Sequence, residues 1–122
     1  MTYPAVGLNE RMRILRYQPG HDFKPHCDGS YFRPDGSQGS FWTVMIYLND
    51  GGGGSTDDES DAFVGGATLF HGRDGRDSVA VVPRAGSVLV FDHDLYHEGQ
   101  KVTRGTKYAI RTDVMFQLSS TA

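Results

Sequence analysis

The chain has 122 residues and a formal net charge of −3 at pH 7, so we expect one domain over residues 1–122 with a single hydrophobic core. This mild acidity argues against nucleic acid or an anionic membrane as a partner. No apolar run approaches the roughly twenty residues of a membrane-spanning helix, and no signal-peptide pattern opens the chain. The one cysteine, Cys27, excludes an intrachain disulfide and fits a reducing compartment, so we expect a cytoplasmic protein.

Residues 1–10 carry no clear pattern, whereas short segments rich in β-branched and aromatic residues follow, separated by many of the sixteen glycines. They predict strands at 11–17, 23–28, 41–48, 67–71, 78–82, 87–91 and 107–118, with a further segment opened by His97. The 41–48 stretch, FWTVMIYL, is expected to be buried on both faces. About eight short strands without a long helix predict an all-β sandwich, jelly roll or small barrel.

Two stretches between these strands are expected to be loops. Residues 29–39 are rich in Gly, Ser, Pro and Asp but also hold Tyr31, Phe32 and Arg33, which is unusual bulk for a loop without a binding role. Residues 50–64 contain four consecutive glycines and an acidic run at 57–59, and they are interpreted as a flexible, solvated insertion. No spacing there resembles a calcium-binding loop.

A candidate metal site begins at His26 and Asp28. Side chains two residues apart on an extended strand share a face. One imidazole and one carboxylate, joined by a distant imidazole, form a two-histidine, one-carboxylate triad, a set that suits non-haem Fe(II) with open coordination positions. His97 is the favoured third ligand, and His93 is its competitor.

Three protein ligands leave room for a bidentate α-keto acid and for oxygen. A cation is then needed to hold the far carboxylate of that keto acid. Lys107 and Arg111 lie on one face of the last expected strand, and either can supply this charge.

These residues belong to a longer ordered pattern. It consists of Tyr17-x-Pro19-Gly20, Phe23-x-x-His26-x-Asp28, the run from Met45 to Asn49, Gly65-Gly66-Ala67-Thr68-x-Phe70, Pro83-x-x-Gly86-x-x-x-x-Phe91, and His97-x-Gly99-x-x-Val102-x-x-Gly105-x-Lys107-Tyr108. In this order the chain resembles the 2-oxoglutarate and Fe(II)-dependent dioxygenases, specifically the prolyl 4-hydroxylase-like group.

The resemblance implies a double-stranded β-helix of the jelly-roll or cupin-like kind, here with few or no bracing helices. It implies His26, Asp28 and His97 as catalytic iron ligands and Lys107 as the main partner of the distal 2-oxoglutarate carboxylate. Tyr17 and Tyr47 match tyrosines near the cosubstrate. Arg111 replaces an apolar residue and is expected to share or divide the role of Lys107.

The activity implied by the resemblance is hydroxylation of a C–H bond using Fe(II), 2-oxoglutarate and O2, with ascorbate as a supporting reductant. The leading substrate is a prolyl or other residue in a peptide or protein, and the alternative is a free amino acid or other small molecule. Asp28 favours hydroxylation over halogenation, because related halogenases carry a small residue there. A different class remains open, namely a metal-binding jelly roll without catalysis.

Several other residues are expected to be structural or peripheral. Cys27 alternates away from the ligand face and is predicted to be a small core residue. Trp42 is also predicted to lie in the core. His71 is expected at the rim of the site and His21 in solvent.

Overall fold

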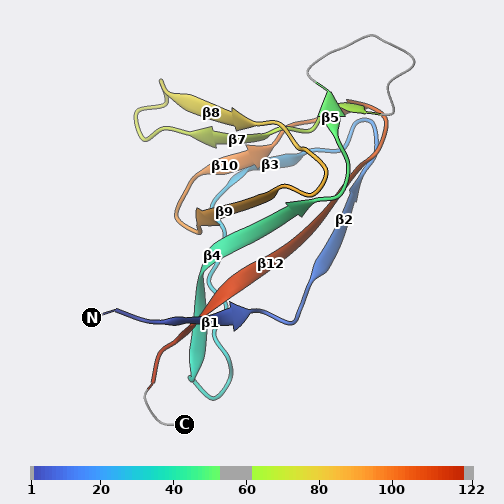
Figure 1. The fold of residues 1–122 in the computed structure, drawn as a ribbon. Helices are drawn as coiled ribbons and strands as arrows, with labels where there is room; N and C mark the ends of the chain where they lie inside the picture. Colours follow the sequence, from blue (N-terminus) through green and yellow to red (C-terminus); the bar gives the residue numbers. More distant parts are fainter. Residues whose placement is uncertain (1, 53–61, 120–122) are drawn as a thin grey trace.

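The computed structural model describes residues 2–52 and 62–119 as β-strands and connecting loops, and no helix occurs in these ranges (Figure 1). In chain order the strands are β1 (Ala5–Leu8), β2 (Arg13–Tyr17), β3 (Phe23–His26), β4 (Gln38–Tyr47), β5 (Gly51–Gly52), β6 (Phe63–Gly65), β7 (Thr68–His71), β8 (Ser78–Val81), β9 (Val88–Asp92), β10 (His97–Gly99), β11 (Val102–Arg104) and β12 (Lys107–Gln117). The all-β prediction is confirmed. Consequently, no helix capable of crossing a membrane is found within the described ranges.

The strands form two main sheets that face each other. The larger sheet has the order β1-β12-β4-β9, with β2 pairing along the other part of β12, and the smaller has the order β3-β10-β7-β8. Phe70 of β7 and Phe91 of β9 join them through an edge-to-face contact with ring centroids 5.0 Å apart. This two-sheet, antiparallel arrangement is the jelly roll expected from the sequence.

The N-terminal strand β1 was not expected. It pairs with β12 opposite Val114 to Phe116, while β2 pairs with β12 opposite Lys107 to Arg111. The chain between β1 and β2 therefore passes along one edge of β12, where Thr112 donates a hydrogen bond to the Asn9 carbonyl at 2.7 Å. A single long strand thus organises the whole N-terminal part of the chain.

Two burial predictions are wrong. Trp42 is 44% exposed and makes an edge-to-face contact with Phe116, so the 41–48 stretch is not buried on both faces. Cys27 does alternate away from His26, but that side faces solvent rather than the core. For Cys27 the alternation was interpreted correctly, whereas for 41–48 burial of both faces was expected; in both cases the sequence did not show which face another element covers.

The expected insertion at 50–64 is structured at both ends. Gly51 and Gly52 pair in parallel with Phe63 and Val64, and the prediction of a flexible segment is wrong for these residues. The acidic run at 57–59 lies outside the described residues.

Phe63 is fully buried among three glycines. A Cβ on Gly51 or Gly66 would come within 2.9 or 3.0 Å of its ring, and one on Gly105 within 3.0 Å of its backbone. Gly66 and Gly105 also have φ angles of +72° and +75°, which disfavour other residues. These glycines therefore allow the β5, β6 and β11 region to close tightly around one aromatic ring.

We predict that Phe63→Ala lowers the free energy of unfolding by about 3–5 kcal/mol, because it removes a buried ring and leaves a cavity. Urea titration followed by circular dichroism measures this loss. Ile14→Ala is the control, since Ile14 is 75% exposed and its truncation should cost little. Equal losses in the two variants would contradict the assignment of Phe63 to the core.

Candidate metal centre

The two imidazoles of the candidate site meet across one strand pair. β3 and β10 are antiparallel neighbours, and their register places His26 directly opposite His97. Residues paired in this way project to the same side of a sheet, and the two ring centroids are 4.4 Å apart. The convergence of residues 71 positions apart in sequence is thus a direct result of strand pairing.

Backbone hydrogen bonds orient both rings. The Nδ1 atom of His26 lies 2.6 Å from the Lys24 carbonyl, and the Nδ1 atom of His97 lies 2.8 Å from the Leu95 carbonyl. Because a carbonyl only accepts, each Nδ1 carries the proton and each Nε2 keeps its lone pair. Burial lowers the pKa of His97, which favours the neutral imidazole that binds metals. Both rings are therefore held in the tautomer that ligates through Nε2.

Asp28 supplies the third donor from just beyond the end of β3, which ends at His26. The expectation that residues 23–28 form one strand is therefore wrong for its last two residues. Asp28 Oδ1 lies 3.2 Å from His26 Nε2 and 3.7 Å from His97 Nε2, and the carboxylate side chain is only 2% exposed. Leaving the strand does not separate the ligands, since the backbone N–H of Asp28 is held by the His93 carbonyl at 3.0 Å.

The geometry of this triad fits a metal ion. One donor atom from each of His26, Asp28 and His97 lies within 4.8 Å of the other two. With both Nδ1 atoms protonated, the two Nε2 lone pairs and a carboxylate oxygen face one another, and a shared cation relieves the repulsion among such acceptors. Two nitrogens and one oxygen are the donor set that non-haem Fe(II) uses.

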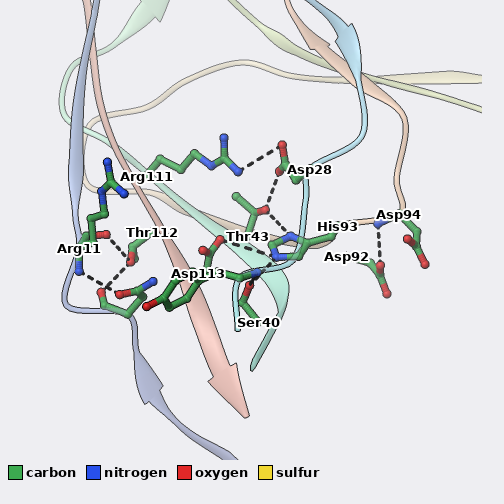
Figure 2. A network of polar contacts seen from close by, with 12 residues as sticks. Arg11, Asp28, Ser40, Thr43, Asp92, His93, Asp94, Arg111, Thr112 and Asp113 are labelled. Carbon is green, nitrogen blue, oxygen red and sulfur yellow. Dashed lines mark hydrogen bonds and ion pairs between the residues drawn. The ribbon is translucent and has the colours of Figure 1, made fainter. Parts of the chain in front are cut away.

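A second layer of polar side chains supports Asp28 from below (Figure 2). Thr43 donates to Asp28 Oδ2 at 2.6 Å and lies 2.9 Å from His93 Nδ1. The other ring nitrogen of His93 lies 3.0 Å from the Ser40 hydroxyl, and His93 itself is only 3% exposed. His93, the competing ligand candidate, is thus a buried supporting residue rather than a member of the triad.

Thr43 was not identified from the sequence. It lies on β4 two residues before Met45 and four before Tyr47, so all three share one face of that strand. Because Tyr47 was expected near the cosubstrate, the shared strand face could have placed Thr43 near the site as well.

A cavity of about 120 Å3 adjoins the triad. It is lined by all three candidate metal ligands and by residues of β2, β3, β4, β7, β9, β10 and β12: Arg13, Leu15, Tyr17, Phe23, Met45, Thr68, Phe91, Gly99, Lys107 and Arg111. The cavity thus combines a wall of candidate metal ligands, apolar sides and three cations, which are the features of a site for a small anionic ligand.

Lys107 is buried in this cavity wall, at 4% exposure. Its ammonium donates to the Gly66 carbonyl at 2.7 Å and lies 4.9 Å from the centroid of the Tyr17 ring, its cross-strand partner. An ammonium has three N–H donors, so donors remain for a ligand carboxylate. A Cβ on Gly66 would lie 3.2 Å from the Lys107 side chain, which explains why a glycine suits that position.

The two tyrosines take different places. Tyr17 lines the cavity, whereas Tyr47 is 1% exposed and its hydroxyl is hydrogen-bonded to that of Thr68 at 2.7 Å. Burial raises the pKa of both phenols, which keeps them protonated as hydrogen-bond donors. Tyr47 therefore reaches the cavity through Thr68, which does line it.

Arg111 lines the same cavity, on the side of the triad. Its Nη2 lies 3.3 Å from Asp28 Oδ1, and Figure 2 shows the side chain extended toward that carboxylate. The two cations expected on one face of β12 are both present, but one lies near Gly66 and the other beside Asp28.

The remaining histidines lie outside the triad. His71 is half-buried and its Nε2 lies 3.2 Å from Glu98. His21 is exposed, as expected, and its Nδ1 accepts a hydrogen bond from the Gln18 N–H at 3.0 Å.

We predict that Thr43→Val weakens metal binding roughly tenfold, because loss of a hydrogen bond to a ligating carboxylate typically costs 10- to 100-fold in affinity. Competition against a fluorescent chelator with Mn(II) measures the change. Thr112→Val is a matched control, since it also loses a buried hydroxyl but one bonded to the Asn9 carbonyl. The idea fails if both variants bind Mn(II) as the wild type does.

Burial lowers the pKa of Lys107 to about 8. The unfolded chain then binds more protons than the folded one between pH 8 and the ordinary lysine pKa of about 10.4. We therefore predict that Lys107 makes the free energy of unfolding rise as the pH rises through this interval. Urea titrations at several pH values, with Lys107→Met as control, test this. If the unfolding free energy of Lys107→Met rose with pH by the same amount, the effect would belong to other titrating groups.

The family described as the 2OG-Fe(II) oxygenase superfamily matches residues 12–112. A comparison with curated proteins gives no match.

Among solved structures, a Pseudomonas putida prolyl-4-hydroxylase is similar with a TM-score of 0.61 and 24% identity, covering 93% of this chain and 55% of that one. A prolyl hydroxylase from Trichoplax adhaerens, in complex with a hypoxia inducible factor peptide fragment, has a TM-score of 0.61 and 20% identity, covering 94% and 46%. The chain thus spans about half the length of these proteins.

A cupin domain from Bordetella pertussis is similar with a TM-score of 0.51 and 16% identity, covering 93% of this chain and 97% of that one. Together with the two-sheet arrangement, these likenesses confirm the double-stranded β-helix. Because the family match extends over residues 12–112 and includes every member of the His26, Asp28 and His97 cluster, this chain belongs to the 2OG-Fe(II) oxygenase superfamily.

Proposed function

We propose that this chain is the catalytic core of a 2-oxoglutarate-dependent hydroxylase with His26, Asp28 and His97 as its Fe(II) ligands. The observation that carries the proposal is the joint presence of the triad and a buried, protonatable Lys107 on the walls of one cavity. Bound iron, 2-oxoglutarate and O2 supply the oxidising chemistry that inserts hydroxyl into a C–H bond. The protein residues bind, orient and shield these groups.

Lys107 is proposed to hold the distal carboxylate of 2-oxoglutarate. Its ammonium is fixed by the Gly66 carbonyl and the Tyr17 ring, so little rotamer freedom is lost on binding. A buried lysine facing an apolar cavity is costly without an anionic partner, and a dicarboxylate provides one. Tyr17 is proposed to contact the cosubstrate directly, and Tyr47 to act on it through Thr68.

Arg111 is proposed to act at the triad end of the cavity rather than at the distal carboxylate. Its guanidinium faces Asp28 Oδ1, where it would orient the carboxylate and add positive charge beside the triad. Under this proposal Lys107 and Arg111 divide the role, which is one of the two arrangements that the sequence left open.

A prolyl residue in a peptide or protein is the proposed substrate. Support comes from the fold, which is shared with a prolyl-4-hydroxylase and with a prolyl hydroxylase bound to a peptide fragment. A free amino acid or other small molecule is the alternative. We also propose that the protein works in the cytoplasm, where ferrous iron and the free thiol of Cys27 remain reduced.

The test is succinate formation from 2-oxoglutarate in air, with Fe(II) and ascorbate as supporting reductant, with and without a panel of proline-rich peptides. We predict that His26→Ala, Asp28→Ala and His97→Ala each abolish turnover while the circular dichroism spectrum stays that of a folded β protein. A variant with full activity would remove its residue from the triad.

The same assay includes Lys107→Ala, which should raise the concentration of 2-oxoglutarate needed for half-maximal turnover at least tenfold, because a charge-assisted contact is lost. If that concentration stayed unchanged, Arg111 rather than Lys107 would be the residue that holds the distal carboxylate. Peptide-stimulated succinate supports the protein hydroxylase, and unstimulated turnover supports a small-molecule substrate. Tight Fe(II) binding without any turnover by the wild type would favour a non-catalytic metal module.

A further inference from the structure

A second, larger cavity lies beside the first. Its volume is about 300 Å3, and it is formed by the connection between β1 and β2, the loop after Asp28 and the middle of β12. Its lining residues are Asn9, Glu10, Arg11, Arg13, Gly29, Tyr31, Arg111, Thr112 and Asp113. A volume of this size admits an amino-acid residue together with part of its neighbour.

Positive charge dominates this second cavity. Arg11, Arg13 and Arg111 line it, against the carboxylates of Glu10 and Asp113. Glu10 is already engaged, because Arg33 donates to both of its oxygens at 2.9 Å and holds the pKa of Glu10 at about 2.

The carboxylate of Asp113 also lines the cavity and lies toward the buried His93. Its Oδ1 is buried, lies 3.8 Å from His93 Nε2 and has no hydrogen-bond partner among the described residues. By contrast, no ion pair is found for the guanidinium of Arg11 or of Arg13 within the parts of the chain that the structure describes. Two cations in the cavity wall are therefore available to an anionic ligand.

The second cavity adjoins the metal centre. Gly29, in its wall, directly follows Asp28, and a Cβ at Gly29 would meet no atom within 4 Å, so the wall is open there. Arg13 and Arg111 line both cavities, and Arg111 lies 3.3 Å from the candidate metal ligand. A molecule in the larger cavity therefore lies next to the triad, on the other side of these two arginines from the cosubstrate pocket.

We propose that this second cavity binds the primary substrate and selects one that carries a carboxylate close to the carbon to be hydroxylated. Arg11 and Arg13 hold that carboxylate, since guanidinium groups bind carboxylates in bidentate fashion. Tyr31, which is 42% exposed, offers its ring to the apolar part of the substrate. The proposal rests on the proposed function, because it takes the triad to be the reaction centre.

Binding is measured apart from turnover, so that the two proposals can fail separately. Fluorescence anisotropy is recorded for labelled peptides that carry one proline preceded by Glu, Gln or Lys, under nitrogen with Fe(II) and 2-oxoglutarate, and again without metal. We expect the Glu peptide to bind roughly tenfold more tightly than the Gln peptide, as for one charge-assisted contact. The Lys peptide should bind more weakly than both.

The decisive variant is Arg11→Gln, because Arg11 lines only the second cavity. It should reduce the preference for Glu over Gln to less than about threefold. Arg16→Gln is the matched control, since it removes the same charge from β2 at an exposed position outside both cavities. It should keep the full preference.

Competition by N-acetylglutamate against the bound Glu peptide distinguishes the two sources of the carboxylate. Displacement at an affinity equal to that of the peptide assigns the site to a small carboxylic acid, and much weaker displacement assigns it to an acidic peptide.

The proposal is overturned if Glu and Gln peptides bind equally, if neither carboxylate probe binds, if Arg11→Gln keeps the preference, or if Arg16→Gln loses it to the same extent. An Arg11-dependent preference without succinate formation would uphold this site and reject the oxygenase instead.

Discussion

The pairing of β3 with β10 is the constraint on which the rest of the site depends. It sets His26 opposite His97 and brings their Nε2 atoms to one side of a small sheet. A slip of one residue in this register would turn one of the two imidazoles to the opposite face. Because both Nδ1 atoms are bonded to backbone carbonyls of nearby residues, the strand pairing fixes ring orientation and tautomer as well as position.

Support for the third ligand comes from the opposite sheet. Asp28 has left β3, and its carboxylate is held by Thr43 of β4, which in turn contacts His93. The candidate metal centre thus lies between the two sheets, with two candidate ligands from one and the anchor of the third from the other. This division means that the triad forms only when the sheets have packed together, so folding and metal affinity are coupled.

The long strand β12 distributes positive charge along the site. Lys107 and Arg111 lie on one face of it, four residues apart, and the structure places the first near Gly66 and the second near Asp28. The shared face was clear from strand alternation. Their separate surroundings depend on the connection between β6 and β7, which holds Gly66, and on the loop after β3, which holds Asp28. The cavity at the triad and the adjoining arginine-lined cavity can therefore share one wall.

The sequence by itself determined the fold class and the candidate site residues. Strand alternation and the ordered motifs identified His26, Asp28, His97 and Lys107, because ligand chemistry and local periodicity are written directly in the order of residues. Only the tertiary structure decided which sheet faces were covered, which explains the errors at Cys27 and Trp42. It alone also revealed Thr43 as the anchor of Asp28 and the cavity beside Arg11, since contacts between residues far apart in sequence arise from packing and leave no local pattern.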